Sequence, residues 1–154
     1  MTRVSTNGPA TLLRLEGVNT YYGQMHILQN VNLRVAEGEL VCLLGGNASG
    51  KSTTLKTILG IVPARTGSIV LGEQDVTRDP TSRRIELGLA IVPENRRLFG
   101  PMTVLENLEM GAYLRPRADL KEDLERVYEI FPHVAERRKQ LAGTLSGGEQ
   151  QMVA

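Results

Sequence analysis

A chain of 154 residues with 41% hydrophobic and 23% charged residues has the size and composition of one folded domain, and nothing in it indicates disorder. The formal net charge of +1 is too small to indicate a nucleic-acid partner. The basic runs Arg83-Arg84, Arg96-Arg97 and Arg137-Arg138-Lys139 are interleaved with glutamates and are expected to be solvated surface. No stretch approaches the roughly 18 apolar residues of a membrane-spanning helix, so any membrane link is expected to run through a partner.

The first hundred residues carry the pattern of a sheet with helices. Broken apolar alternation predicts antiparallel strands over residues 12–22 and 27–35, and the continuous apolar run 40–44 is typical of a buried parallel strand. Cys42, the only cysteine, lies in that run, which predicts a buried thiol and fits a reducing compartment. Residues 51–61 have the period of a helix. Farther along we expect strands over residues 67–72 and 89–92, and between them a helix with Asp79 as N-cap, Pro80 as its first residue and Gly88 at its end.

The composition becomes helical after residue 102. Thr103 with Glu106, and Asp119 with Glu122, have the spacing of capping boxes, in which a side chain at the helix entrance and a glutamate three residues later bond each other's backbone. Residues 114–117 are expected to break the helical stretch. The remaining pattern predicts one apolar helical face made of Leu120, Leu124, Val127, Tyr128 and Phe131.

A glycine-rich loop follows the apolar run 40–44 and precedes the predicted helix. Its pattern, Gly-x4-Gly-Lys-Ser, is a P-loop, in which backbone N–H groups cradle phosphates, Lys51 reaches the terminal phosphates and the Ser52 hydroxyl binds Mg²⁺. A GTPase would also need an Asn/Thr-Lys-x-Asp motif, and the sequence has none. The candidate phosphate-binding residues are Gly45, Asn47, Ala48, Ser49, Gly50, Lys51, Ser52 and Thr53. The methyl group of Ala48 is a modest intrusion in this loop if its φ is negative and a costly one if its φ is positive.

A second glycine motif, residues 145–149 (LSGGE), lies near the last residue. Ser146 and Glu149 have capping-box spacing, so Gly147 and Gly148 have two interpretations: a flexible helix entrance, or a loop that binds phosphate. Its position about ninety residues after a P-loop favours the second.

Together the two motifs resemble those of the ATP-binding subunits of bacterial ABC transporters, and the resemblance extends from Leu12 to Ala154. It is most similar to the branch that serves branched-chain amino acid importers. The runs that carry this closer match are residues 21–23 (YYG), 91–99 (IVPENRRLF), 102–108 (MTVLENL) and 140–152 (QLAGTLSGGEQQM).

The resemblance implies roles for further residues. Tyr22 is expected to stack on adenine, although its neighbour Tyr21 makes the choice ambiguous, since adjacent strand residues face opposite sides. Glu94 is expected to reach the metal, with Ser52, in a site for ATP and Mg²⁺. Ser146, Gly147, Gly148 and Glu149 are expected to serve a nucleotide bound to a second ATP-binding subunit. His26 and His133 have no partner at catalytic or metal-binding spacing and receive no role.

The implied fold is an α/β P-loop NTPase core of the ABC ATPase type, with antiparallel N-terminal strands, a parallel sheet and an inserted helical subdomain. We expect a polar tail (residues 1–11), a partial core (12–102), the helical subdomain (103–145) and the start of the signature helix (146–154). The resemblance also implies transmembrane permease partners and a cytoplasmic position at the inner face of the membrane.

The resemblance places the catalytic glutamate, which acts as the general base in the family, beyond Ala154. We therefore expect no catalytic residue within the chain, and the chain alone is predicted to be an inactive ATPase.

Two other functions are compatible with the sequence. A non-transport ABC ATPase would act as a mechanical clamp in DNA repair or on the ribosome. The repair type separates its two motifs by a very long coiled coil, unlike the short helical segment predicted here. The third possibility is a nucleotide-binding fragment without catalysis.

Overall fold

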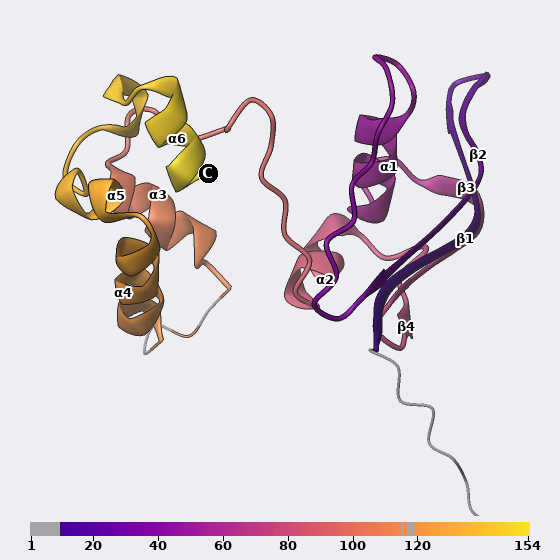
Figure 1. Ribbon diagram of the computed structural model, residues 1–154, viewed down its shortest axis with the longest axis horizontal. Coiled ribbons are helices and arrows are strands. Elements are labelled where there is room, and N and C mark those ends of the chain that lie inside the picture. Colours follow the sequence, from indigo (N-terminus) through magenta and orange to yellow (C-terminus); the bar gives the residue numbers. More distant parts are fainter. Residues whose placement is uncertain (1–9, 115, 117–118) are drawn as a thin grey trace, which may run out of the picture. The chain divides into compact units, whose positions relative to one another are not determined.

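The computed structural model describes residues 10–114, 116 and 119–154. It divides into two compact units, one ending at Leu89 and the other beginning at Ala90 (Figure 1). The N-terminal unit contains the sheet, and the C-terminal unit contains helices. Most of the predicted polar tail and part of the predicted break at residues 114–117 lie outside the described residues.

The N-terminal unit is built on a four-stranded antiparallel sheet with strand order β2-β1-β3-β4. The hairpin of β1 (Thr11–Tyr22) and β2 (Met25–Ala36) confirms the two predicted antiparallel strands. Its tight turn contains Gly23 at φ +59, a conformation that glycine adopts at little cost. β3 (Ala64–Leu71) pairs with the other side of β1, and the two-residue β4 (Gln74–Asp75) forms the edge.

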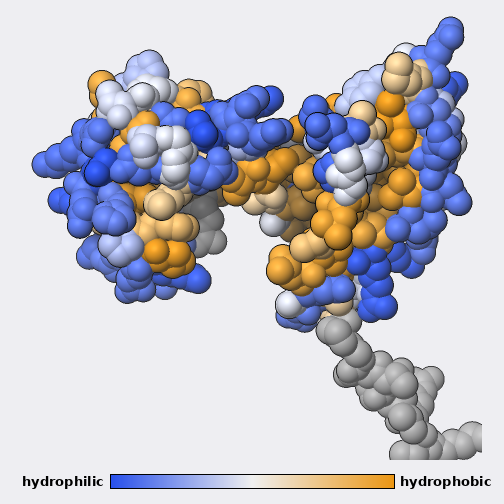
Figure 2. All heavy atoms as spheres, turned by 45° about the horizontal axis from the view of Figure 1, so that its top comes forward, coloured by the Kyte–Doolittle hydropathy of each residue, from blue (hydrophilic) through white to orange (hydrophobic). Residues whose placement is uncertain are grey.

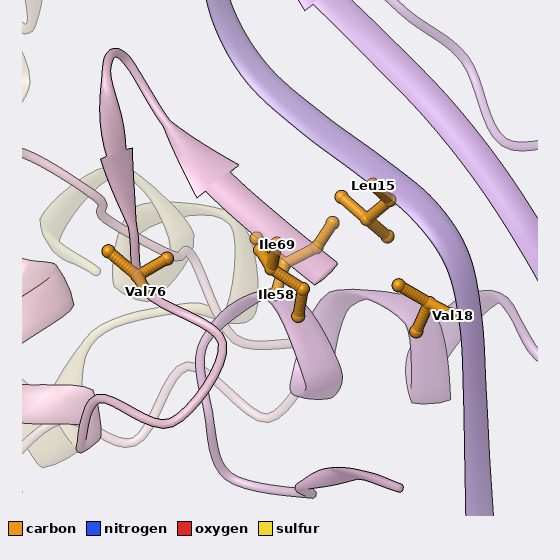
Figure 3. Close-up of a cluster of buried hydrophobic side chains, with 5 residues drawn as sticks. All are labelled: Leu15, Val18, Ile58, Ile69 and Val76. Carbon is orange, nitrogen blue, oxygen red and sulfur yellow. The ribbon is translucent and has the colours of Figure 1, made fainter. Parts of the chain in front are cut away.

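One face of this sheet packs against α1 (Lys51–Ile58). Apolar side chains from two strands, the helix and the segment after β4 meet there, as Figure 3 shows; they are Leu15, Val18, Ile58, Ile69 and Val76. The Thr20 and Thr57 hydroxyls, both buried, share a hydrogen bond of 3.2 Å that ties α1 to β1. On this unit polar side chains cover the outer face of the sheet, and apolar ones gather on the other face (Figure 2).

Two predicted strands do not form in the described chain. Residues 40–44 and 89–92 are irregular, and the Leu40 and Leu44 side chains are 90% and 91% exposed. A strand needs a hydrogen-bonded neighbour, whereas the described strands pair only with one another and in antiparallel fashion. The parallel part of the expected sheet is therefore not formed by these residues. Cys42 lies in the first of these irregular segments and is exposed, so the prediction of a buried thiol is wrong.

The helix α2 (Thr81–Glu86) begins one residue later than predicted. Pro80 is extended (φ −67, ψ 160) and is itself the N-cap, so the prediction of Asp79 as N-cap is wrong. The predicted end is confirmed by Gly88, which follows the C-cap Leu87 at φ +96.

Arg84 of α2 corrects the expectation that the basic runs are solvated, because it is only 2% exposed. Its guanidinium donates to four backbone carbonyls: Thr57 (2.9 Å), Ile58 (2.7 Å), Thr77 (3.1 Å) and Asp79 (3.1 Å). Burial lowers the pKa of Arg84 from its usual value, and the Asp79 carboxylate partly opposes this. The side chain is buried because carbonyl oxygens replace the water that solvates an exposed guanidinium.

The C-terminal unit consists of short helices around a small apolar cluster. The cluster contains Val104, Val134, Leu145 and Val153. The elements are α3 (Val104–Gly111), α4 (Leu120–Ile130), α5 (Pro132–Glu136), the 3₁₀ turn η1 (Ala142–Thr144) and α6 (Gly147–Val153).

The two predicted capping boxes of this unit have different outcomes. The box of Thr103 and Glu106 is present, with both reciprocal bonds formed at the start of α3. The box of Asp119 and Glu122 is wrong, since Asp119 has helical dihedrals (φ −87, ψ −16) and its side chain makes no capping bond to α4. Capping requires an extended N-cap residue, which the spacing alone does not guarantee. Among the described helices, none combines the length and apolar character that crossing a membrane requires.

Candidate functional site

The P-loop has a backbone that favours glycine at three of its positions. Gly45, Ala48 and Gly50 have φ values of +151, +64 and +91. A Cβ at Gly45 would lie 2.6 Å from the Ser49 hydroxyl, so that position also lacks space for a side chain. Glycine occupies two of these three positions, as their positive φ favours, whereas the third is occupied by Ala48, which has the costly positive φ.

The loop leads directly into α1, for which Gly50 is the N-cap without a side-chain cap. Thr54 is the first residue of α1 whose N–H donates a backbone hydrogen bond, and its acceptor is the Gly50 carbonyl at 2.8 Å. None of the described residues accepts a hydrogen bond from the N–H groups of Lys51, Ser52 or Thr53. Such groups at a helix N-terminus, with the positive end of the helix dipole, bind anions.

The Lys51 ammonium folds over the loop that precedes it. Its Nζ donates to the carbonyls of Gly45 (2.8 Å) and Gly46 (2.7 Å) and lies 3.4 Å from the Ser49 hydroxyl. An anion must therefore exchange places with these oxygens to bind Lys51. Asn47, Ser49 and Ser52 are exposed beside it, whereas the Thr53 side chain is 9% exposed and only its backbone N–H suits a ligand.

Tyr21 and Tyr22 have different surroundings at the end of β1. The Tyr21 ring stacks on His26 with centroids 4.1 Å apart, and the Arg65 guanidinium lies 4.9 Å from the Tyr21 ring centroid. His26 belongs to β2 and Arg65 to β3, so Tyr21 has ring contacts with strands on both sides of β1. Tyr22 is 46% exposed and is the one of the pair whose ring suits stacking on a ligand.

The second glycine motif forms the start of α6. Ser146 is the N-cap (φ −61, ψ 160), its Oγ accepts from the Glu149 N–H at 3.4 Å, and its own N–H donates to Glu149 Oε2 at 2.8 Å. The capping-box interpretation is thus present in full. The capping box does not exclude phosphate binding, because Ser146, Gly147 and Gly148 are all exposed.

Glu149 of this motif is also paired with Arg137, which follows α5. Hydrogen bonds from the Ser146 hydroxyl and N–H hold the pKa of Glu149 below its usual value, and the Arg137 charge and the nearby His133 act in the same direction. The carboxylate is therefore charged at neutral pH.

The two signature glycines differ in their neighbours. A Cβ at Gly147 would lie 3.0 Å from Nη2 of Arg96, while nothing lies within 4 Å of a Cβ at Gly148. Arg96 and Arg97 both have positive φ, and Arg96 is half-buried, with an Nε atom that has no hydrogen-bond partner in the described chain. Gly147 thus accommodates the Arg96 guanidinium. Glu94, two residues earlier in the same loop, is exposed.

The candidate residues fall into two groups. The P-loop and Tyr22 belong to the N-terminal unit, and Glu94 and the signature residues belong to the C-terminal unit. The structure gives contacts among the P-loop residues and between Ser146 and Glu149, and the roles of Tyr22 and Glu94 stay predictions. The described residues contain no cluster of three His, Cys, Asp or Glu side chains able to hold a metal ion.

The family profile of ABC transporters matches residues 28–154. The chain belongs to this family. It is 43% identical over 143 residues to the high-affinity branched-chain amino acid transport ATP-binding protein BraG of Pseudomonas aeruginosa, covering 93% of the chain and 61% of that relative. It is 36% identical, with the same coverage, to the probable branched-chain amino acid transport ATP-binding protein LivF of Archaeoglobus fulgidus. The chain thus spans about three fifths of the length of these ABC proteins.

Solved ABC structures share its fold. An ATP-binding subunit of an ABC transporter superposes with a TM-score of 0.82 at 30% identity, covering 93% of the chain and 59% of that subunit. A nucleotide-free ATP-binding cassette superposes with a TM-score of 0.79 at 25% identity, covering 93% and 62%. These matches confirm the predicted ABC ATPase fold class.

The general base of this ABC ATPase family was expected beyond Ala154, and that expectation stays a prediction. Ala154 is the C-cap of α6, and its N–H donates to the Gln150 carbonyl at 3.1 Å. The expected position of the general base after the signature rests on the family resemblance, and so does the expected inactivity of the chain alone.

Sequence reasoning missed Arg96 and Arg137 as neighbours of the ABC signature motif. Both belong to basic runs that were interpreted as solvated surface, and nothing in their spacing links them to Gly147 or Glu149. Contacts between residues 12 or 51 positions apart depend on the packing of the helices, which local sequence patterns do not report.

Proposed function

We propose that this chain is the nucleotide-binding part of an ABC importer subunit, which binds ATP with Mg²⁺ and hydrolyses it to drive uptake of branched-chain amino acids. The observation that carries the proposal is the P-loop, where unpaired N–H groups of α1 and the Lys51 ammonium gather at one exposed loop. The solute is inferred from the branched-chain amino acid transport function of the two relatives with 43% and 36% identity.

The roles of the residues follow from their chemistry. Lys51 exchanges its loop carbonyls for phosphate oxygens, the N–H groups of residues 51–53 bind the same phosphates, and the exposed Tyr22 ring stacks on adenine. Ser52 and Glu94 supply hydroxyl and carboxylate oxygens, the ligand types that Mg²⁺ prefers. Bound Mg²⁺ would neutralise phosphate charge, and phosphate oxygens would complete its ligands because the described chain has no metal cluster of its own.

The signature motif is proposed to serve a nucleotide held by a second ATP-binding subunit. Ser146, Gly147 and Gly148 lie at the entrance of α6, and Gly148 has open space on its Cβ side, so a phosphate can approach the backbone there. A triphosphate between two such sites gains charge-assisted hydrogen bonds from both subunits. The importer would also contain transmembrane permease subunits, which would hold this subunit at the cytoplasmic face of the membrane.

The test compares Lys51→Ala with Lys56→Ala, which removes the same charge from the exposed side of the same helix. Binding of a fluorescent ATP analogue with Mg²⁺ should weaken about tenfold in Lys51→Ala, because one charge-assisted hydrogen bond is lost and the loop contacts partly offset it. Lys56→Ala should bind like the wild type. Equal affinity in all three proteins would contradict the proposed nucleotide site.

The role of the signature is tested with Ser146→Arg. Sedimentation should show that Mg²⁺-ATP promotes association of the wild type and not of Ser146→Arg, while the affinity of the single subunit for the ATP analogue stays the same. If Ser146→Arg instead weakens nucleotide binding as much as Lys51→Ala, the signature acts on the nucleotide of its own chain.

A further inference from the structure

The orientation of the Ser146 side chain is set by Glu149. The Ser146 hydroxyl oxygen accepts from the Glu149 N–H, and Glu149 Oε2 accepts from the Ser146 N–H. The Ser146 hydroxyl also interacts with the Glu149 carboxylate and helps to keep the pKa of that group low. The direction of the hydroxyl at the entrance of α6 therefore depends on where the carboxylate lies.

The other oxygen of the same carboxylate is held from outside the motif. Glu149 Oε1 pairs with Nη1 of Arg137, which lies twelve residues earlier in the chain. The two oxygens therefore have different partners. Oε2 takes part in the capping box with Ser146, and Oε1 forms the ion pair with Arg137. The Glu149 side chain is 21% exposed and that of Arg137 is 43% exposed, so water competes for the pair only in part.

Arg137 is itself held in place. Its N–H donates to the His133 carbonyl at 3.3 Å, and its carbonyl accepts from the Gln140 N–H at 2.8 Å. In the apolar cluster Val134 of α5 packs with Leu145, the first residue of the signature motif, and with Val153 of α6. Arg137 thus projects from a backbone that is anchored on the same core as α6.

We propose that Arg137 is a positioning residue for the signature motif, which fixes the Ser146 hydroxyl and the first turn of α6 through Glu149. The inference rests on the proposed function of Ser146 toward a nucleotide held by a second subunit. It goes beyond that function because it assigns the orientation of the Ser146 hydroxyl to Arg137, a residue of the helical unit that lies outside the motif.

The first measurement needs no nucleotide. NMR would follow the pKa of the Glu149 carboxyl and the hydrogen exchange of the Ser146 N–H in the wild type, Arg137→Met, Arg137→Lys and Arg138→Met. Arg138 is the matched control, because it is the adjacent arginine and its side chain bonds the Ala135 carbonyl instead of Glu149.

We expect Arg137→Met to raise the pKa of Glu149 and to speed exchange of the Ser146 N–H about two- to fivefold, as for loss of a partly exposed ion pair. His133, the other basic residue near Glu149, remains in every variant. Arg137→Lys, which keeps the charge, should lie between the wild type and Arg137→Met, and Arg138→Met should match the wild type. Identical results for Arg137→Met and Arg138→Met would overturn the inference.

A double-mutant cycle keeps the test decisive if Arg137→Met also disturbs the fold. In a Glu149→Gln background, adding Arg137→Met should change Ser146 exchange little, because its partner is already gone. An undiminished effect in that background would show that Arg137 acts on Ser146 by a route other than Glu149, and the inference would be wrong.

The second measurement is association in Mg²⁺-ATP. Arg137→Met should weaken association about two- to fivefold without changing the affinity of the single subunit for the ATP analogue, whereas a general loss of structure would weaken both. Wild-type strength of association in Arg137→Met would contradict the inference while leaving the proposed function intact. If the wild type itself does not associate, the proposed function of the signature fails, and the NMR comparison alone decides whether Arg137 positions Ser146.

Discussion

At the scale of single residues, Ala48 combines a glycine conformation with an alanine side chain. Its φ of +64 lies in the left-handed region, which costs an L-residue about 1–2 kcal/mol. The residue lies in the loop whose carbonyls and hydroxyl contact Lys51. The P-loop therefore stores strain close to its functional lysine, as backbones at functional sites often do.

Replacing Ala48 by glycine should release this strain. The gain of about 1–2 kcal/mol is offset by the greater freedom of glycine in the unfolded chain, about 0.4–1 kcal/mol, which leaves a net stabilisation of about 0.5–1 kcal/mol. Thermal unfolding would show a melting temperature a few degrees higher, about 1–4 °C.

Ala112→Gly is the control for Ala48→Gly. Ala112 is the C-cap of α3 at φ −89, where alanine is under no such strain, so glycine should give no gain. A loss of stability in Ala48→Gly as large as in Ala112→Gly would show that the left-handed conformation of Ala48 is not populated.

At the scale of elements, the two ends of α1 differ in their chemistry. The N–H groups of its first turn have no acceptor among the described residues, whereas its C-terminal carbonyls of Thr57 and Ile58 accept hydrogen bonds from Arg84. A cation at that end also complements the negative end of the helix dipole. Arg84 therefore joins α1, the segment after β4 and α2.

Arg84→Met should destabilise the protein by about 2–4 kcal/mol, because it keeps the bulk of the side chain but leaves buried carbonyls without donors. The neighbouring Arg83 makes an exposed ion pair with Glu86 at 3.0 Å, so Arg83→Met should cost about 0.5 kcal/mol or less. Chemical denaturation of both variants measures the difference. Equal losses for the two arginines would exclude the proposed support of α1.

The sequence predicted those elements that depend on neighbouring residues. The β1–β2 hairpin follows from apolar alternation around Gly23, and the boxes at Thr103 and Ser146 follow from a three-residue spacing. The strands expected over residues 40–44 and 89–92 failed because a strand depends on a partner that no local pattern supplies. For the same reason the burial of Arg84 and the pairing of Arg137 with Glu149 could not be predicted.

At the scale of the whole molecule, acid should weaken both units. Hydrogen bonds from Thr77 lower the pKa of Asp75 in the N-terminal unit. Hydrogen bonds from Thr103 and Ser146 lower the pKa values of Glu106 and Glu149 in the C-terminal unit. A carboxyl whose pKa is lower in the folded state stabilises the protein above its ordinary pKa, near 3.8 for Asp and 4.5 for Glu. This stabilisation is lost as the pH falls through the folded-state value.

We therefore expect the melting temperature to change little between pH 7 and about pH 5 and to fall steadily below that. Glu106→Gln should reduce the slope of this fall, because the capping glutamine cannot titrate. A melting temperature that stays constant down to about pH 3, or a slope that Glu106→Gln does not reduce, would contradict the assignment of these carboxyls.

The four carbonyl oxygens around the Arg84 guanidinium also determine which nearby positions require a particular side chain. All four of its acceptors are main-chain oxygens, so residues 57, 58, 77 and 79 keep the hydrogen bonds whatever side chains they carry. Gly60 is the exception, because a Cβ there would lie 2.9 Å from Nε of Arg84. For this contact network the side-chain requirement therefore falls on Arg84 and Gly60, whereas the side chains of Thr57 and Ile58 are constrained by other contacts, the hydrogen bond to Thr20 and the apolar cluster under the sheet.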